Sequence, residues 1–169
     1  AKDITPASCD DVITVGALDY RSGDKSSFSN YGSDTVDVSA AGSNIFALRP
    51  NSTDANIESN NVSSVSGTSF ASPLIAAVAG GIKMKYPELT PYQIERILES
   101  NSRTISFNEY GEVSECSRYG CGAGTVDALE ALESIDNLLT ENRSTVNHVY
   151  EGITDNRYLE EMDRLVEVC

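Results

Sequence analysis

The chain is organised around one stretch, Val65-Ser66-Gly67-Thr68-Ser69-Phe70-Ala71-Ser72-Pro73, in which a polar turn runs straight into an apolar segment. Apolar residues dominate over 74–84, so we expect a helix that begins near Ser69 and is buried on every side. Gly67 is expected to let the chain turn sharply before this helix. Pro73 is expected in the first helical turn, where a missing N–H group costs nothing.

Ser69 stands where two physical effects favour negative charge. The first N–H groups of a helix have no intrahelical partner, and they lie at the positive end of the helix dipole. A nucleophilic serine placed there can direct its own N–H toward the oxyanion that it creates. The alternative is that Thr68 or Ser69 simply caps the helix, which is the role that spacing alone favours.

The composition is that of a globular, acidic protein. Of 169 residues, 40% are hydrophobic, and 26 acidic residues against 12 basic ones give a net charge of -14. This charge disfavours nucleic acid as a partner, because phosphates attract basic surfaces. No apolar run reaches the length of a membrane span, so no membrane partner is expected either.

Hydrophobic patterning predicts strands in the first part of the chain and helices after them. The β-branched run Val12–Leu18 is typical of a strand buried on both faces, as in a parallel sheet. Thr90-Pro91-Tyr92-Gln93 has the pattern of a capping box and predicts the start of a helix. Residues 101–124 have the composition of a loop. The remaining elements are expected as strands near 36–42 and 45–48, a helix over 69–85, and a short helix over 128–134 that Asp127 caps.

Several motifs together resemble the subtilisin-like serine proteases, or subtilases. Gly67-Thr68-Ser69-Phe70-Ala71-Ser72-Pro73 is similar to the nucleophile motif of that family, Gly-Thr-Ser-x-Ala-Ala/Ser-Pro. The resemblance covers roughly residues 1–133, and its other motifs follow in the family's order: Pro6-Ala7-Ser8-Cys9, Val12-Ile13-Thr14-Val15-Gly16-Ala17, Phe28-Ser29-Asn30-Tyr31-Gly32, Val36-Asp37-Val38-Ser39-Ala40-Ala41-Gly42, Pro87-Glu88-Leu89-Thr90-Pro91 and Gly122-Ala123-Gly124-Thr125-Val126-Asp127-Ala128.

The resemblance implies an α/β fold of three layers, with a mainly parallel sheet between helices, of which this chain holds the C-terminal half. Residues 1–135 would form the C-terminal part of the catalytic domain, and 136–169 an acidic tail or linker with helical spacing. The implied function is that of a secreted serine endopeptidase that hydrolyses peptide bonds through an acyl-enzyme on Ser69. The catalytic Asp and His would lie in the missing N-terminal half, which thereby becomes a partner beside the protein or peptide substrate.

The same resemblance assigns the substrate-binding residues. Ile4, Thr5 and Pro6 would wall the pocket for the side chain before the scissile bond. Ser66 and Gly67 would flank the leaving-group side, with Thr68 as a further substrate-binding residue. The chemistry requires no cofactor, and no metal ligand is assigned, although the family leaves a structural calcium open in the complete enzyme.

The four cysteines are consistent with an oxidising compartment. Cys116 and Cys121 flank a short loop and could close a disulfide if their Cα atoms lie within reach. The resemblance to secreted bacterial subtilases with disulfides favours this pair and an extracellular location. In such relatives the cysteine at the position of Cys9 pairs with an upstream partner, and the pairing of Cys9 and Cys169 stays open. Four reduced, buried thiols are the alternative.

Two other functions stay open. One is a peptide-binding pseudoprotease whose upstream half lacks the catalytic base. The other is a sedolisin-type carboxyl-serine peptidase, which shares a Ser-Gly-Thr-Ser turn but uses a glutamate base, and the motifs over 6–17 argue against it. The single histidine, His148, follows Ser69 in the chain, opposite to the subtilase order, and we interpret it as a surface residue.

Overall fold

The computed structural model describes residues 4–9, 11–48 and 62–141, with side chains as far as residue 135. The strands and helices follow in chain order as β1 (Val15–Asp19), β2 (Val38–Ser43), β3 (Ile45–Leu48), β4 (Val62–Val65), α1 (Thr68–Lys85), α2 (Pro91–Ser100), β5 (Ser102–Arg103), α3 (Glu115–Tyr119), β6 (Thr125–Val126) and α4 (Ala128–Glu141).

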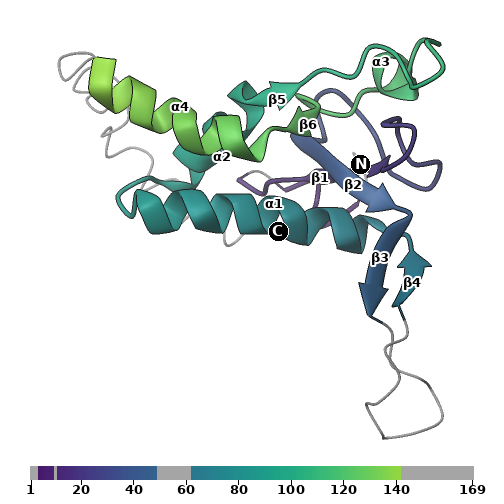
Figure 1. Ribbon diagram of the computed structural model, residues 1–169, viewed down its shortest axis with the longest axis horizontal. Helices are drawn as coiled ribbons and strands as arrows, with labels where there is room; N and C mark the ends of the chain where they lie inside the picture. Colours follow the sequence, from purple (N-terminus) through teal and green to yellow (C-terminus); the bar gives the residue numbers. More distant parts are fainter. Residues whose placement is uncertain (1–3, 10, 49–61, 142–169) are drawn as a thin grey trace, which may run out of the picture.

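Four strands form one mainly parallel sheet, in the order β1-β2-β6-β5. β1 pairs parallel with β2, with Val15 opposite Val38 and Ala17 opposite Ala40. β6 continues the parallel pairing, and β5 closes the edge in antiparallel orientation. The parallel sheet predicted from Val12–Leu18 is therefore confirmed, although β1 begins three residues later than predicted, at Val15, and with the helices the sheet gives the expected α/β fold. β3 and β4 form a separate antiparallel hairpin that projects from the body (Figure 1).

The main core lies between the sheet and three helices. Ala17 and Val38 of the sheet belong to the same buried cluster as Ile75 and Ile82 of α1. Leu98 from α2 belongs to it too and is fully buried, and α4 adds two further side chains. Small residues on the strands let α1 lie close against β1 and β2, which fixes the start of α1 relative to the sheet.

The burial of α1 differs from the expectation. Only Ala71, Ile75 and Ile82 are buried, whereas Leu74 is 47% and Met84 86% exposed. Within the described residues, one side of an apolar helix is therefore covered and the other faces solvent. A helix that is apolar all round needs neighbours on all sides, and the described part of this chain supplies them on one side.

The C-terminal elements agree with the patterning in part. Thr90 caps α2 through a capping box with Gln93, as predicted. The segment 101–124, expected as a loop, contains the short helix α3 and strand β5. Asp127 accepts the Glu130 N–H at 3.1 Å and caps α4, which runs to Glu141 and beyond the predicted end at Ser134. None of the described helices has the length and apolar character that crossing a membrane requires.

Candidate active site

The turn before α1 is held against the end of β2. The Gly67 N–H donates to the Gly42 carbonyl oxygen at 2.7 Å. A Cβ on Gly42 would lie 2.6 Å from the Cβ of Ala17 and 3.0 Å from the Gly67 oxygen, so only glycine fits there. Gly67 itself has an extended backbone, with φ 161° and ψ 150°. Gly67 therefore does not supply the sharp turn that the sequence analysis expects of it. The close approach of the turn to β2 depends instead on Gly42, whose role the sequence did not reveal.

Ser69 is the second residue of α1, and its side chain is exposed. The residue at the N-cap is Gly67, and no side chain caps the helix. The capping role for Thr68 or Ser69 is therefore wrong, because both residues lie inside the helix. The Phe70 N–H donates to the Gly67 carbonyl oxygen at 3.0 Å. Without a side-chain acceptor, the N-terminus of α1 keeps N–H groups and dipole available for an anionic group.

Pro73 lies deeper in α1 than expected. It is the sixth helical residue, in the second turn rather than the first. At this position its missing N–H removes the hydrogen bond that would go to the carbonyl of Ser69, four residues earlier. The proline therefore frees a backbone acceptor on the residue that carries the candidate nucleophile.

The three predicted substrate-binding residues next to Ser69 lie in the turn between β4 and the start of α1. Ser66 and Thr68 are exposed, and Gly67 is half-buried. The Ser66 Oγ accepts the Asn44 N–H at 3.1 Å, which ties the turn to the start of β3. This contact gives Ser66 a positioning role in addition to the predicted contact with substrate.

Ile4, Thr5 and Pro6 form a separate exposed turn. The Ser8 N–H donates to the Ile4 oxygen at 2.8 Å, and the Thr14 Oγ1 donates to the Ala7 oxygen at 2.7 Å. These bonds anchor the turn to the segment that leads into β1. Among the described residues, no hydrogen bond joins this turn to Thr68 or Ser69.

The described part of the chain offers Ser69 no histidine as general base, and His148 lies outside it. Within the same residues, no hydrogen bond engages the Ser69 hydroxyl. A serine hydroxyl without a base is a weak nucleophile. The described part thus presents a nucleophile position and an uncapped helix N-terminus without a complete catalytic set.

A cluster of three carboxylate side chains, which the sequence analysis did not single out, lies where the residue before β2 meets α2. Asp37, Glu95 and Glu99 each bring one carboxylate oxygen within 4.8 Å of the others. Burial raises the pKa of Glu95, the charges of Asp37, Glu99 and Asp11 raise it further, and Arg96 lowers it. The four-residue spacing of Glu95 and Glu99 on one helix was the available signal. Oxygen ligands of this kind suit a hard cation such as calcium.

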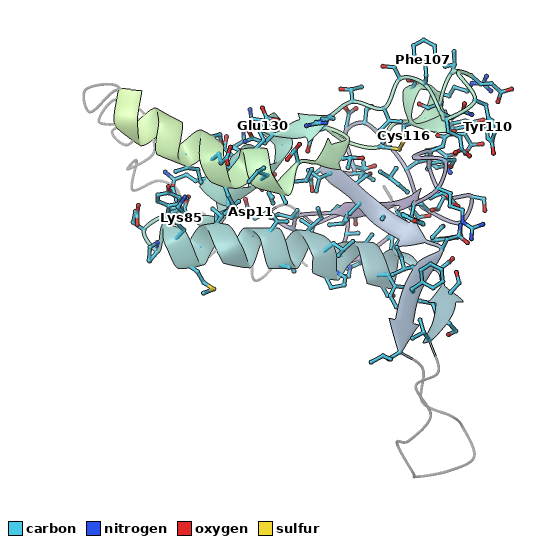
Figure 2. The ribbon with its side chains drawn as sticks, viewed as in Figure 1. Asp11, Lys85, Phe107, Tyr110, Cys116 and Glu130 are labelled. Carbon is cyan, nitrogen blue, oxygen red and sulfur yellow. A yellow bond between two sulfur atoms is a disulfide. The ribbon has the colours of Figure 1, made fainter. Side chains whose placement is uncertain are left out.

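Cys116, in α3, and Cys121 are brought together, and Cys116 lies above β2 in the view of Figure 2, whereas α1 runs below it. Their sulfur atoms are bonded, and their Cα atoms lie 5.0 Å apart. Both are buried and pack against Leu18, while the neighbouring rings of Phe107 and Tyr110 are exposed. The Ser39 hydroxyl donates to the Cys121 carbonyl oxygen at 3.0 Å, which anchors the loop to β2.

Comparison with known proteins finds relatives that are proteases by name. The sequence profile of the subtilase family, Peptidase_S8, matches residues 4–124. An extracellular protease of Xanthomonas campestris is 38% identical over 133 residues, which is 78% of this chain and 21% of the relative. Subtilisin DY of Bacillus licheniformis is 34% identical over 123 residues, which is 73% of this chain and 38% of the relative.

Solved structures agree with this result. A protease from Pseudoalteromonas arctica superposes with a TM-score of 0.59 and 31% identity over 77% of this chain and 38% of the other. Fervidolysin from Fervidobacterium pennivorans gives a TM-score of 0.60 with 26% identity over 76% of this chain and 20% of the other. The chain thus spans well under half the length of these relatives. The match to the family profile extends from the turn at Ile4 through the Ser69 motif to Gly124, and we conclude that the chain belongs to the subtilase family of serine proteases.

Proposed function

We propose that this chain is the C-terminal part of the catalytic domain of a subtilisin-like serine endopeptidase with Ser69 as its nucleophile. The observation that carries the proposal is the position of Ser69, an exposed residue in the first turn of a helix without a side-chain cap. The family motif around it and the protease relatives support the same role. The catalytic Asp and His lie upstream, in the part of the relatives' length that this chain does not span.

Each step of the reaction gives a task to residues of this chain. The Ser69 Oγ attacks the carbonyl carbon of the scissile peptide bond, and its proton passes to the histidine of the upstream part. The oxyanion accepts a hydrogen bond from the backbone N–H of Ser69 at the positive end of α1. The C–N bond then breaks, the amine leaves with the proton, and water releases the acid from Ser69 by the same route.

The substrate is a protein or peptide, and the place of action is outside the cell. Several relatives are extracellular proteases or subtilisins by name, which supports secretion. The Cys116–Cys121 disulfide suits an oxidising compartment. Ile4, Thr5 and Pro6 line the pocket for the residue before the scissile bond, while Ser66 and Gly67 border the leaving-group side. Thr68 is a further substrate-binding residue.

The test is active-site labelling of the complete protease that contains this chain. A fluorophosphonate probe should react with Ser69, and Ser69→Ala should abolish both labelling and peptide hydrolysis. Ser72→Ala is the matched control, because Ser72 is also exposed and lies in the same helix. That variant should keep both activities. Labelling that persists in Ser69→Ala would refute the assignment, and peptide binding without labelling in the unmodified protein would favour a pseudoprotease.

A further inference from the structure

Asn44 forms the corner between the sheet and the hairpin. β2 ends at Ser43 and β3 begins at Ile45, so Asn44 is the one residue between them. Figure 1 shows β2 running into β3 at the end of the sheet where α1 begins. The φ of Asn44 is 60°, in the left-handed region. Residues other than glycine seldom adopt this conformation, and asparagine does so more readily than most because its short amide forms local hydrogen bonds.

The Asn44 side chain is held by Asp19, the last residue of β1. The Asn44 Nδ2 donates to the Asp19 Oδ2 at 2.8 Å. The other carboxylate oxygen, Oδ1, accepts the Arg21 N–H at 2.8 Å and the Ser22 N–H at 3.2 Å. All three partners of Asp19 are donors, so each of its two oxygens must be an acceptor. An amide at this position would turn its NH2 group toward one of these donors.

A shift in strand register brings Asp19 to the corner. β1 and β2 are paired in step until Asp19, which lies opposite Ser43 rather than opposite Gly42. An irregularity of this kind changes the direction of a side chain at the end of a strand. Asp19 therefore lies beside the residue that follows Ser43, which is Asn44.

The backbone of Asn44 is bonded to the turn that carries the candidate nucleophile. Its N–H donates to the Ser66 Oγ at 3.1 Å. Ser66 directly precedes the N-cap of α1, and Ser69 follows it by three residues. The Cα atoms of the two serines are therefore at most about 11 Å apart. Two successive hydrogen bonds thus connect the Asp19 carboxylate to this turn, and we call Asp19, Asn44 and Ser66 the positioning network.

We propose that Asp19 and Asn44 are positioning residues for the Ser69 nucleophile. This inference rests on the proposed function and adds to it two residues that act through Ser66. Asp19 holds the Asn44 corner, the corner holds the Ser66 hydroxyl, and Ser66 holds the turn that directs the Ser69 Oγ at the scissile carbonyl. Misplacing a reacting group by about 1 Å can lower turnover about 10²-fold. Disruption of the positioning network should therefore lower kcat and leave KM almost unchanged.

The experiment exchanges donor and acceptor between Asp19 and Asn44 in the complete protease. Asp19→Asn turns an amide toward the Asn44 amide, and Asn44→Asp turns a carboxylate toward the Asp19 carboxylate. Each single variant should lower kcat for a peptide p-nitroanilide about tenfold and change KM by less than about twofold. The double variant Asp19→Asn/Asn44→Asp restores one donor and one acceptor in the reverse direction. It should recover most of the lost kcat, and a double variant no faster than the single ones would contradict the inference.

Turnover is expressed per active site, counted from the endpoint of fluorophosphonate labelling. A merely structural role would lower the number of active sites or the melting temperature and would leave kcat per site unchanged. Asp24→Asn is the matched control, because it makes the same chemical change in the loop that follows β1. The Asp24 Oδ1 accepts the N–H groups of Lys25 and Glu115, each at 2.8 Å. This variant should keep both kcat and KM.

A second set of variants tests whether the effect passes through Ser66. In Ser66→Ala the Asn44 N–H has lost its acceptor, so adding Asp19→Asn should lower kcat by less than about twofold further. A tenfold effect of Asp19→Asn that persisted in Ser66→Ala would show that Asp19 acts by another route, which overturns the inference.

One further variant separates misfolding from misplacement. Asn44→Gly adopts the left-handed corner without strain and removes only the amide, so it should fold and still lower kcat severalfold. Unchanged kcat per site in Asn44→Gly and Asp19→Asn would overturn the inference, while their labelling by fluorophosphonate would uphold the proposed function. An unmodified enzyme that neither hydrolyses the p-nitroanilide nor reacts with fluorophosphonate would refute the proposed function itself.

Discussion

The position of the candidate nucleophile depends on small residues that bring backbone segments together. Gly42, at the end of β2, lies directly against Ala17 and the Gly67 carbonyl oxygen. The Gly42 oxygen also accepts the Gly67 N–H. The turn that carries Ser69 is therefore seated on the sheet through a glycine far from it in sequence.

Gly42→Ala should displace this turn. The added Cβ would lie 2.6 Å from the Ala17 Cβ, so backbone must move to accommodate it. We expect the fluorophosphonate reaction rate to fall at least tenfold and the melting temperature to fall as well. Gly81→Ala is the control, because its Cβ would meet only Leu132 at 3.9 Å, and alanine favours a helix by about 0.5–1 kcal/mol. Equal labelling rates in the two variants would contradict the role of Gly42.

Glu95 makes stability depend on pH. Its folded pKa is raised from 4.5, chiefly by burial and then by Asp37, so the folded state binds the proton more tightly than the unfolded state. The contribution of Glu95 to stability is therefore most favourable below pH 4.5 and declines as pH rises through the raised folded pKa. Glu95→Gln should raise the melting temperature at pH 7 by a few degrees, and the gain should vanish toward pH 4.

Melting curves of the complete protein in EDTA, from pH 4 to 8, test this prediction without a bound cation. Glu133→Gln, at an exposed position on α4, is the matched control and should show no such trend. A gain for Glu95→Gln that grew as pH fell would have the wrong sign and would contradict the pKa argument.

At the scale of elements, local signals predicted the starts of α1 and α2 well, but not the end of α4. α2 begins where the capping box predicts, with the Thr90 N–H donating to Gln93 Oε1 at 2.7 Å and the Gln93 N–H donating to Thr90 Oγ1 at 3.2 Å. The start of α1 was also predicted to within one residue. Its burial was not, because burial depends on what packs against a helix rather than on its own composition.

Thr90→Ala removes one half of the capping box. The Gln93 N–H then loses its acceptor, and we expect a loss of about 1 kcal/mol in the free energy of unfolding. Chemical denaturation of the complete protein measures it. Thr104→Ala makes the same chemical change at an exposed position outside any helix and should cost less than half as much. A similar cost for both variants would mean that the cap contributes nothing specific.

For the whole molecule, one explanation accounts for both the exposed side of α1 and the absence of a histidine near Ser69 in the described residues. The described residues leave Leu74 and Met84 in solvent and provide no histidine near Ser69. Both gaps are filled if the upstream part of the catalytic domain packs on this chain. Exposed apolar surface of this extent favours self-association when its partner is absent.

The 169-residue chain alone should therefore be poorly soluble and inactive. Removal of the histidine base from a subtilisin, a member of this family, lowers turnover by about 10⁶-fold, a magnitude borrowed rather than derived from this chain. Assays of the purified chain with casein and a peptide ester, beside the complete protease as positive control, test this prediction. Ester turnover that disappeared in Ser69→Ala would show that a base exists within these residues.

The sequence by itself determined the parts that depend on local patterns. The run Val12–Leu18 predicted a parallel strand because β-branched residues on both faces suit a sheet covered on both sides. The motif around Ser69 identified the family. The capping box at Thr90 predicted where α2 begins, because its side chains form hydrogen bonds with backbone N–H groups three residues away. These bonds form regardless of what the helix packs against.

The tertiary structure decided what depends on contacts between distant residues. Two such contacts are the close approach of Gly42 to Gly67 and the clustering of Asp37 with Glu95. The exposed side of α1 likewise depends on which other elements pack against that helix. Hydrophobic periodicity records which residues avoid water, but not which neighbour covers them. That choice is made only when the strands pair and the helices pack.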